Sequence, residues 1–119
     1  MSELMGIGRF ALHEGRADDF ERLSRECMEI VRKKDTGTLR YDIYLNANRT
    51  EAIVIEEYTD ARALQEHLAN IGPGLMAAIS STGELSGEIL GNLSAGLAEQ
   101  LENAPVRTFV PFLSLRTGT

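Results

Sequence analysis

The chain has 119 residues, a length that predicts a single domain over residues 1–119, and its 43% hydrophobic and 25% charged residues are ordinary for a soluble globular protein. Its formal net charge of −6 argues against nucleic acids and anionic membranes as partners, because both attract clustered lysines and arginines. No apolar run approaches the ~20 residues that cross a bilayer, and the opening residues predict no secretory signal.

The first elements in the chain are a strand and a long helix. Alternating side chains predict a strand over residues 4–13. Residues 6–11 formally match the G-x-G-x-x-A dinucleotide pattern, but they lie inside this strand with no helix opening on them, so we reject a nucleotide site. Helical spacing of apolar residues predicts a helix over residues 17–33. Cys27 lies on its apolar face, which favours a core thiol over a nucleophile, and as the only cysteine it agrees with a reducing, cytoplasmic compartment.

The centre of the chain, residues 36–67, predicts two strands and the start of a second helix. Residues 39–45 alternate apolar and polar side chains, and residues 52–58 contain an Ile-Val-Ile run that is apolar on both faces. An exposed sheet surface does not tolerate such a run well, so both faces of that strand need cover. Thr59 or Asp60 caps the next helix, and His67 lies at the edge of its apolar stripe.

The remaining elements are shorter. A break at residues 70–74 is expected to end the second helix, before a brief helical segment at 75–79. Residues 84–90 fit either a helix or a strand, and we favour a short strand because interior glycine costs a helix ~1 kcal/mol per residue. Asn92 or Ser94 then caps a helix to about residue 103. The final strand spans residues 106–115, where Pro111 requires a sheet edge or a bulge, and residues 116–119 form a flexible tail.

The order of these elements predicts an α+β fold. The order fits an antiparallel ferredoxin-like sheet with helices on one face. It runs strand, helix, two strands and helix, followed by a short strand, a helix and a last strand. Helices on one face leave the apolar second face of the strands uncovered. Another chain is therefore expected to cover it.

Several residues in the centre of the chain resemble those of the antibiotic biosynthesis monooxygenase domain. The resemblance rests on Gly37, the trio Arg40-Tyr41-Asp42, the Glu56-Glu57-Tyr58 end of the third strand and a histidine, His67, nine residues after Tyr58. It covers roughly the first 70 residues well and the remainder loosely. It implies a dimeric α/β barrel in which two chains pair through their sheet faces, which agrees with the uncovered sheet face as an indication of a homodimer.

Candidate catalytic residues are few. His13 and His67 have no second His or Cys at metal-ligand spacing, and no cofactor motif is found, so we expect neither a metal nor a cofactor. We name His67 as the candidate catalytic base; the alternative is a hydrogen-bonded residue at the core margin. The candidate substrate-binding residues are Arg40, Tyr44, Asn46 and Tyr58, although the tyrosines also suit packing. Adjacent in a strand, Glu56 and Glu57 face opposite ways and do not form a carboxylate pair.

The resemblance implies a cofactor-independent monooxygenase that oxidises a small aromatic or quinol-type compound with molecular oxygen. The chain has no tryptophan, which argues against the haem-degrading branch of the family and weakens the case for the polyketide-oxidising branch. The alternative is a non-catalytic dimeric barrel that binds a small apolar ligand in a stress or regulatory role. Oxygen uptake that depends on His67 would separate the two, and the sequence does not name the substrate.

Overall fold

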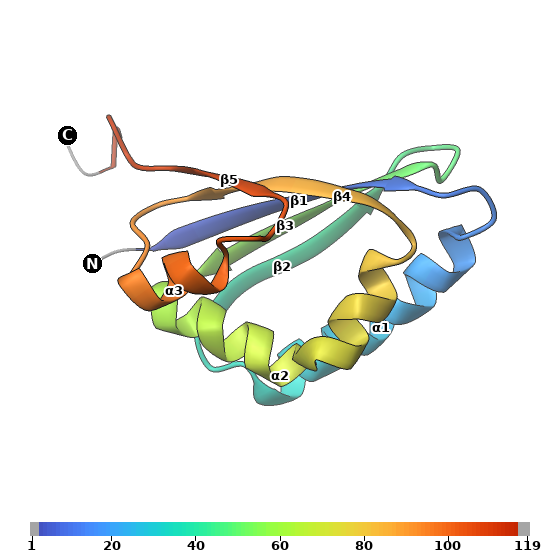
Figure 1. Ribbon diagram of the computed structural model, residues 1–119, viewed down its shortest axis with the longest axis horizontal. Helices are drawn as coiled ribbons and strands as arrows, with labels where there is room; N and C mark the ends of the chain where they lie inside the picture. The colour runs from blue at the N-terminus through green and yellow to red at the C-terminus, as the bar shows by residue number, and fades with distance from the viewer. Residues whose placement is uncertain (1–2, 117–119) are drawn as a thin grey trace.

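The computed structural model describes residues 3–116, which form one five-stranded sheet with helices on a single face (Figure 1). The elements in chain order are β1 (Leu4–Leu12), α1 (Ala17–Lys34), β2 (Thr38–Leu45), β3 (Glu51–Tyr58), α2 (Ala61–Ser80), β4 (Gly83–Leu90), α3 (Ala95–Gln100) and β5 (Val106–Phe109).

The strands lie in the order β2-β3-β1-β4-β5. The first three pairs are antiparallel, and β4 and β5 are parallel. The ferredoxin-like α+β fold is confirmed, but the sheet is mixed where a fully antiparallel sheet was predicted. The reason is α3: a parallel pair needs a crossover connection, and this short helix carries the chain back to the start of β5.

Strand pairing brings side chains from separate strands into rows on the helix-facing side of the sheet. Tyr41 pairs with Glu56, which pairs with Gly6, which pairs with Ile89. The next row contains Ile43, Val54, Gly8 and Gly87. Successive rows on one face are two residues apart, or roughly 7 Å. A polar row and an apolar row therefore lie side by side beneath the helices.

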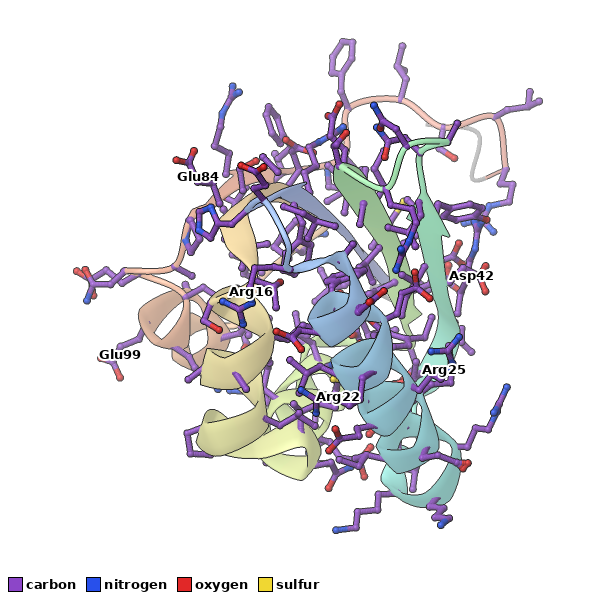
Figure 2. The ribbon with its side chains drawn as sticks, turned by 90° about the vertical axis from the view of Figure 1, so that its right-hand side faces the viewer. Arg16, Arg22, Arg25, Asp42, Glu84 and Glu99 are labelled. Carbon is purple, nitrogen blue, oxygen red and sulfur yellow. The ribbon has the colours of Figure 1, made fainter. Side chains whose placement is uncertain are left out.

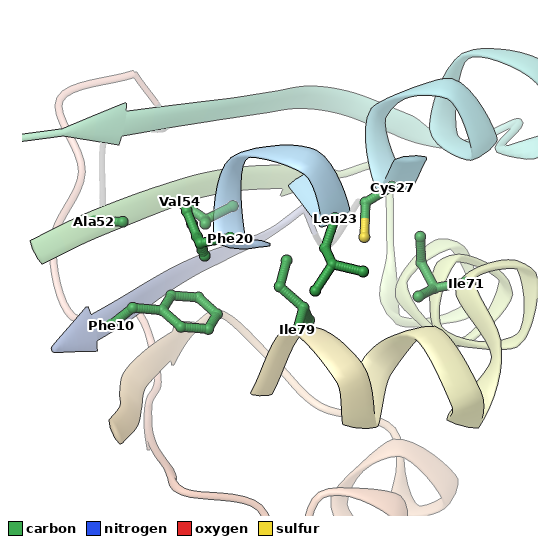
Figure 3. Packing of buried hydrophobic residues seen from close by; sticks show 8 residues of the cluster. All are labelled: Phe10, Phe20, Leu23, Cys27, Ala52, Val54, Ile71 and Ile79. Carbon is green, nitrogen blue, oxygen red and sulfur yellow. The ribbon is translucent and has the colours of Figure 1, made fainter. Parts of the chain in front are cut away.

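The core lies between the sheet and the two long helices. Figure 3 shows its largest cluster, in which Phe20, Leu23 and Cys27 of α1 meet Val54 of β3 and Ile79 of α2. Phe20 is fully buried. Its ring centroid lies 5.0 Å from that of Phe10 on β1. Burying an aliphatic or aromatic side chain contributes about 1.5–3 kcal/mol, so this cluster fixes α1 and α2 against the sheet.

Most of the predicted boundaries are confirmed, including the strand at β4, and three are corrected. The second helix and the segment after it form one element, α2, kinked at Gly72, where φ is 82° and Pro73 follows. The third helix, capped by Ser94, ends at Gln100 rather than near residue 103. The last strand stops at Phe109, short of Pro111, which lacks the N–H for a sheet ladder. Apart from Arg116, the predicted tail lies outside the described residues.

The face of the sheet that points away from the helices combines apolar and charged side chains. Ile53 is 38% exposed, and Tyr44, its partner on β2, is 50% exposed. Asp42 also lies on this side of β2, away from α1 (Figure 2). In residues 3–116 no helix is long and apolar enough to cross a membrane.

Candidate active site

His67 lies on the sheet-facing side of α2. The helix starts where the side chain of Asp60 accepts a hydrogen bond from the Ala63 N–H at 2.9 Å, as the predicted cap required. His67 follows about two turns later and its side chain is only 4% exposed. A histidine this deeply buried needs partners for its ring nitrogens.

Asp35 is the partner of one ring nitrogen. It directly follows α1, and its backbone N–H bonds to the carbonyl of Val31, which ends the helix and directs the side chain inward. One carboxylate oxygen, Oδ2, lies 2.8 Å from His67 Nδ1 and accepts from the Thr38 hydroxyl at 2.6 Å. The other, Oδ1, accepts from the Asn70 amide at 2.8 Å.

This arrangement fixes both the charge of Asp35 and the tautomer of His67. Burial by itself would raise the pKa of Asp35, but the hydrogen bonds from Asn70, Thr38 and His67 outweigh burial and lower that pKa. An ionised carboxylate can only accept hydrogen bonds, so Nδ1 of His67 carries a hydrogen. In the neutral ring, Nε2 is then left as an acceptor, which is the form a general base requires.

Glu56 lies on the other side of the imidazole. Its Oε1 is 4.0 Å from His67 Nε2 and accepts a hydrogen bond from the hydroxyl of Tyr58. Burial is the main cause that raises the pKa of Glu56, with His67 and Tyr58 acting in the opposite direction. Asp35 and Glu56 thus flank the same ring with pKa values shifted in opposite directions, a pattern typical of sites that move protons.

Two tyrosines hold the imidazole between them. The ring centroids of Tyr41 and Tyr58 lie 5.3 Å and 5.5 Å from that of His67, both in tilted geometry. Burial raises the pKa of each tyrosine, so both hydroxyls stay protonated at neutral pH. Burial also raises the pKa of the neighbouring Cys27 thiol to about 11, which agrees with its predicted role as an unreactive core residue.

His67 and Glu56 face a cavity of about 620 Å³ between the sheet and the helices. That volume is in the range that holds a small organic molecule. Apart from these two residues the wall is mainly apolar, with contributions from Tyr41, Val54, Ile71 and Leu85. The arrangement can bind an apolar molecule and exchange a proton with it at one end.

The structure brings together only part of the predicted site. His67 and Tyr58 are neighbours; Tyr58 is not in the cavity wall, but its hydroxyl bonds to Glu56, which is. Arg40 and Tyr44 lie on the opposite face of the sheet, where the guanidinium bonds to the Tyr44 hydroxyl at 3.1 Å, to Asp42 at 2.7 Å and to Glu57 at 3.5 Å. Asn46 bonds to Thr50 in the turn after β2. These three residues are therefore not part of the cavity within this chain.

Two residues of the site were missed from the sequence. Asp35 is 32 positions before His67, and no spacing rule connects a residue after one helix with a residue inside the next. Glu56 was not named as a site residue; its neighbour Glu57 is the glutamate that pairs with Arg40 on the opposite face. The opposite orientation of the two glutamates was predicted correctly, and the burial of Tyr58 two residues later indicates which of them faces inward.

Fold and site together define a ferredoxin-like α+β protein that encloses an acid-base cluster at one end of an apolar cavity. Residues 4–71, more than half of the chain, match the family model described as antibiotic biosynthesis monooxygenase. The chain belongs to that family.

Solved structures agree with this fold. MupZ from Pseudomonas fluorescens has 22% identity and a TM-score of 0.82, over 95% of this chain and 93% of that one. SnoaB from Streptomyces nogalater, described as a cofactor-independent oxygenase, has 19% identity and a TM-score of 0.60, over 73% and 89% of the two chains. Rv0793 from Mycobacterium tuberculosis has 23% identity and a TM-score of 0.64, over 77% and 96%. No curated protein sequence matches the chain.

Proposed function

We propose that this protein is a monooxygenase that oxidises a small aromatic or quinol-type compound with molecular oxygen and without a metal or an organic cofactor. The observation that carries the proposal is the Asp35–His67 pair, with an Nδ1···Oδ2 distance of 2.8 Å, at the wall of an apolar cavity. Membership of the monooxygenase family and the fold shared with SnoaB support it.

In the proposed reaction His67 acts as the base. Nε2 takes the proton of a substrate hydroxyl, and the negative charge of Asp35 stabilises the imidazolium that forms. The electron-rich substrate anion then reacts with oxygen directly. For a quinol the reaction balances as quinol plus O₂ giving hydroxyquinone plus water: one oxygen atom enters the ring, the other leaves as water, and the substrate supplies all the electrons.

The anion also needs hydrogen-bond donors while it exists. Arg40, Tyr44 and Asn46 lie elsewhere in this chain, so the imidazolium of His67 is the nearest donor. In its protonated form the Glu56 carboxyl can donate to an oxyanion as a second group, and burial raises the pKa of this carboxyl. Both donors belong to the wall of the cavity.

We further propose that two chains form a homodimer through the sheet faces that point away from the helices. The exposed side chains of Ile53 and Tyr44 on that face support it, as does the common occurrence of dimers in the family. An obligate contact of this kind buries on the order of 2,000 Å² or more. Light scattering at micromolar concentration should give twice the chain mass, and Ile53→Asp should halve it; a monomeric wild type would refute the proposal. A cytoplasmic location remains a prediction.

Oxygen uptake tests the proposed reaction. The protein is mixed with a naphthoquinol in air-saturated buffer, and uptake is compared with the spontaneous oxidation of the quinol. We expect His67→Gln to lower the enzymatic rate about a hundredfold or more while the variant stays folded, because the base is lost. Arg22→Gln, on the exposed side of α1, is the control. Binding of the quinol without uptake above the spontaneous rate would favour the alternative, a non-catalytic ligand-binding barrel.

A further inference from the structure

Two glycines on the central strand β1, Gly6 and Gly8, have no evident structural purpose. Glycine in a strand interior loses more conformational entropy than other residues and packs nothing. Neither has a positive φ, the backbone conformation that requires glycine. Among the glycines that the structure describes, only Gly15, Gly72 and Gly91 have one. A Cβ at Gly8 would lie 3.7 Å from the Cβ of Val54, an ordinary contact, and one at Gly6 would lie 3.6 Å or more from its neighbours.

The third glycine of this region differs. Gly87 pairs with Gly8, but a Cβ there would collide with the carbonyl oxygen of Ile7, so close approach of the two strands requires it. Gly6 and Gly8 are thus the two positions where a side chain would fit and none is present. Both line the cavity, Gly6 in the row of Glu56 and Gly8 in the apolar row of Val54.

Ser24 on α1 provides an independent observation in the same cavity. It is only 7% exposed, and within the described part of the chain its hydroxyl is buried without a hydrogen-bond partner. Buried hydroxyls are nearly always bonded, because an unpaired one costs free energy. Ser24 lines the cavity one helical turn before Cys27, near Ile43, whose row is roughly 7 Å from that of Tyr41 and Glu56.

We propose that Gly6 and Gly8 form a part of the cavity wall without side chains, called the floor below, against which a flat ligand lies. Ser24 binds a polar atom of that ligand at the end remote from His67. The ligand class is a planar, largely apolar molecule with oxygen atoms at both ends, one facing His67 and Glu56 and the other facing the Ser24 hydroxyl. The inference deepens the proposed function, since it concerns the same cavity, but it requires only binding and no reaction with oxygen.

Variants of the floor should change stability and binding in opposite directions. Gly8→Ala should raise Tm by roughly 1–5 °C, because alanine restricts the unfolded chain and its Cβ fits here. The same variant should weaken binding of a flat arene several-fold, and Gly8→Val at least tenfold, because their side chains occupy the floor. Gly74→Ala is the matched control: a Cβ there meets nothing within 4 Å, so it should raise Tm without affecting binding.

Ser24 is tested with two probes under anaerobic conditions, so that turnover has no influence. Binding of a naphthol, with one hydroxyl, and of a naphthalenediol, with hydroxyls at opposite ends of the ring system, is measured by calorimetry. The wild type should bind the diol about tenfold more tightly, one hydrogen bond being worth roughly that factor. Ser24→Ala should remove this preference, leave the naphthol affinity unchanged and not lower Tm.

Each outcome decides the inference. Equal affinity of the wild type for the two probes, an unchanged preference in Ser24→Ala, tighter or equal arene binding in Gly8→Val, or no binding of either probe up to its solubility limit would overturn it. Loss of the diol preference in Ser24→Ala together with weaker binding in Gly8→Val would support it. Either result is independent of oxygen uptake, so the inference can fail while the proposed monooxygenase reaction holds, and the reverse.

Discussion

Replacing Asp35 by asparagine tests the centre of the site, because the variant keeps the shape of the side chain and removes its charge. Three donors converge on this carboxylate: His67 Nδ1 at 2.8 Å and the Thr38 hydroxyl at 2.6 Å on one oxygen, and the Asn70 amide at 2.8 Å on the other. Asparagine has one acceptor oxygen and one NH₂ group. If its oxygen takes the position of Oδ2, its NH₂ group faces the amide donor of Asn70, and that hydrogen bond is lost.

The size of the effect follows from these contacts. One buried charge-assisted hydrogen bond is replaced by two donors facing each other, and the two others lose their ionic character, so we expect the free energy of unfolding to fall by about 2–4 kcal/mol. Glu26→Gln is the control, since Glu26 and its partner Arg22 lie on α1, away from the proposed dimer contact, with side chains 53% and 62% exposed. It should cost less than about 0.5 kcal/mol. Both free-energy changes are measured by urea unfolding, with the dependence of the unfolding free energy on urea concentration expected to be the same in all three proteins.

The pH dependence identifies the cause. Because the pKa of Asp35 is lower in the folded chain, its contribution is fully present above the unfolded value of ~3.9 and is lost as pH falls through the folded value. The difference between wild type and Asp35→Asn should thus be constant above about pH 5 and shrink towards pH 3. In Asp35→Asn the rate of oxygen uptake at neutral pH should fall about a hundredfold or more, because the His67 ring is no longer held in the tautomer that leaves Nε2 as the acceptor. A difference under about 0.5 kcal/mol, or one independent of pH, would refute this account of the site.

Two further predictions concern the partly buried Glu56 and the buried Cys27, both near His67. Because the pKa of Glu56 is raised in the folded chain, the free energy of unfolding of the wild type should fall as pH rises from the unfolded pKa of ~4.3 through the folded pKa. Urea unfolding of Glu56→Gln across the same pH range should lack this fall. Identical pH profiles for the two proteins would contradict the burial of the carboxyl. With its thiol pKa at about 11, buried Cys27 should resist iodoacetamide in the native chain at pH 8 and react after unfolding in urea; rapid native labelling would show that the thiol is accessible.

The elements of the fold could be predicted because each depends on local pattern. The alternation around Tyr41 and the Ile53-Val54-Ile55 run specified two strands, and the interior-glycine argument correctly favoured a strand at β4. The parallel pairing of β5 was missed, because direction depends on how α3 returns the chain and no local signal records this. The kink of α2 was predicted as a break that ends the helix. In the structure, the positive φ at Gly72 and the proline that follows interrupt the helix, but the helix continues beyond them.

The site was harder to predict because it depends on register. Choosing the polar side of β2 as the wall of the cavity placed Arg40 and Tyr44 beside His67, yet the apolar set that includes Tyr41 and Ile43 is the one that must face the helices. A shift of one residue reverses every side chain in a strand, so this choice affected all the β2 candidates together. The inward orientation of His67 was predicted correctly, because it depends on helical periodicity and the Asp60 cap and not on the register of a strand.

The two faces of the sheet therefore have different consequences for mutation. On the inner face, Glu56 and the glycines of β1 border the cavity, so changes there should affect ligand binding and chemistry within one chain. On the outer face, Arg40 connects Asp42, Tyr44 and Glu57 in a cluster beside exposed apolar side chains. If two chains pair through this face, the cluster becomes buried, and removing Arg40 would leave two carboxylates unpaired at the contact. Arg40→Gln should then weaken association while each chain keeps its cavity, a result that separates a role in the dimer from a role in substrate binding.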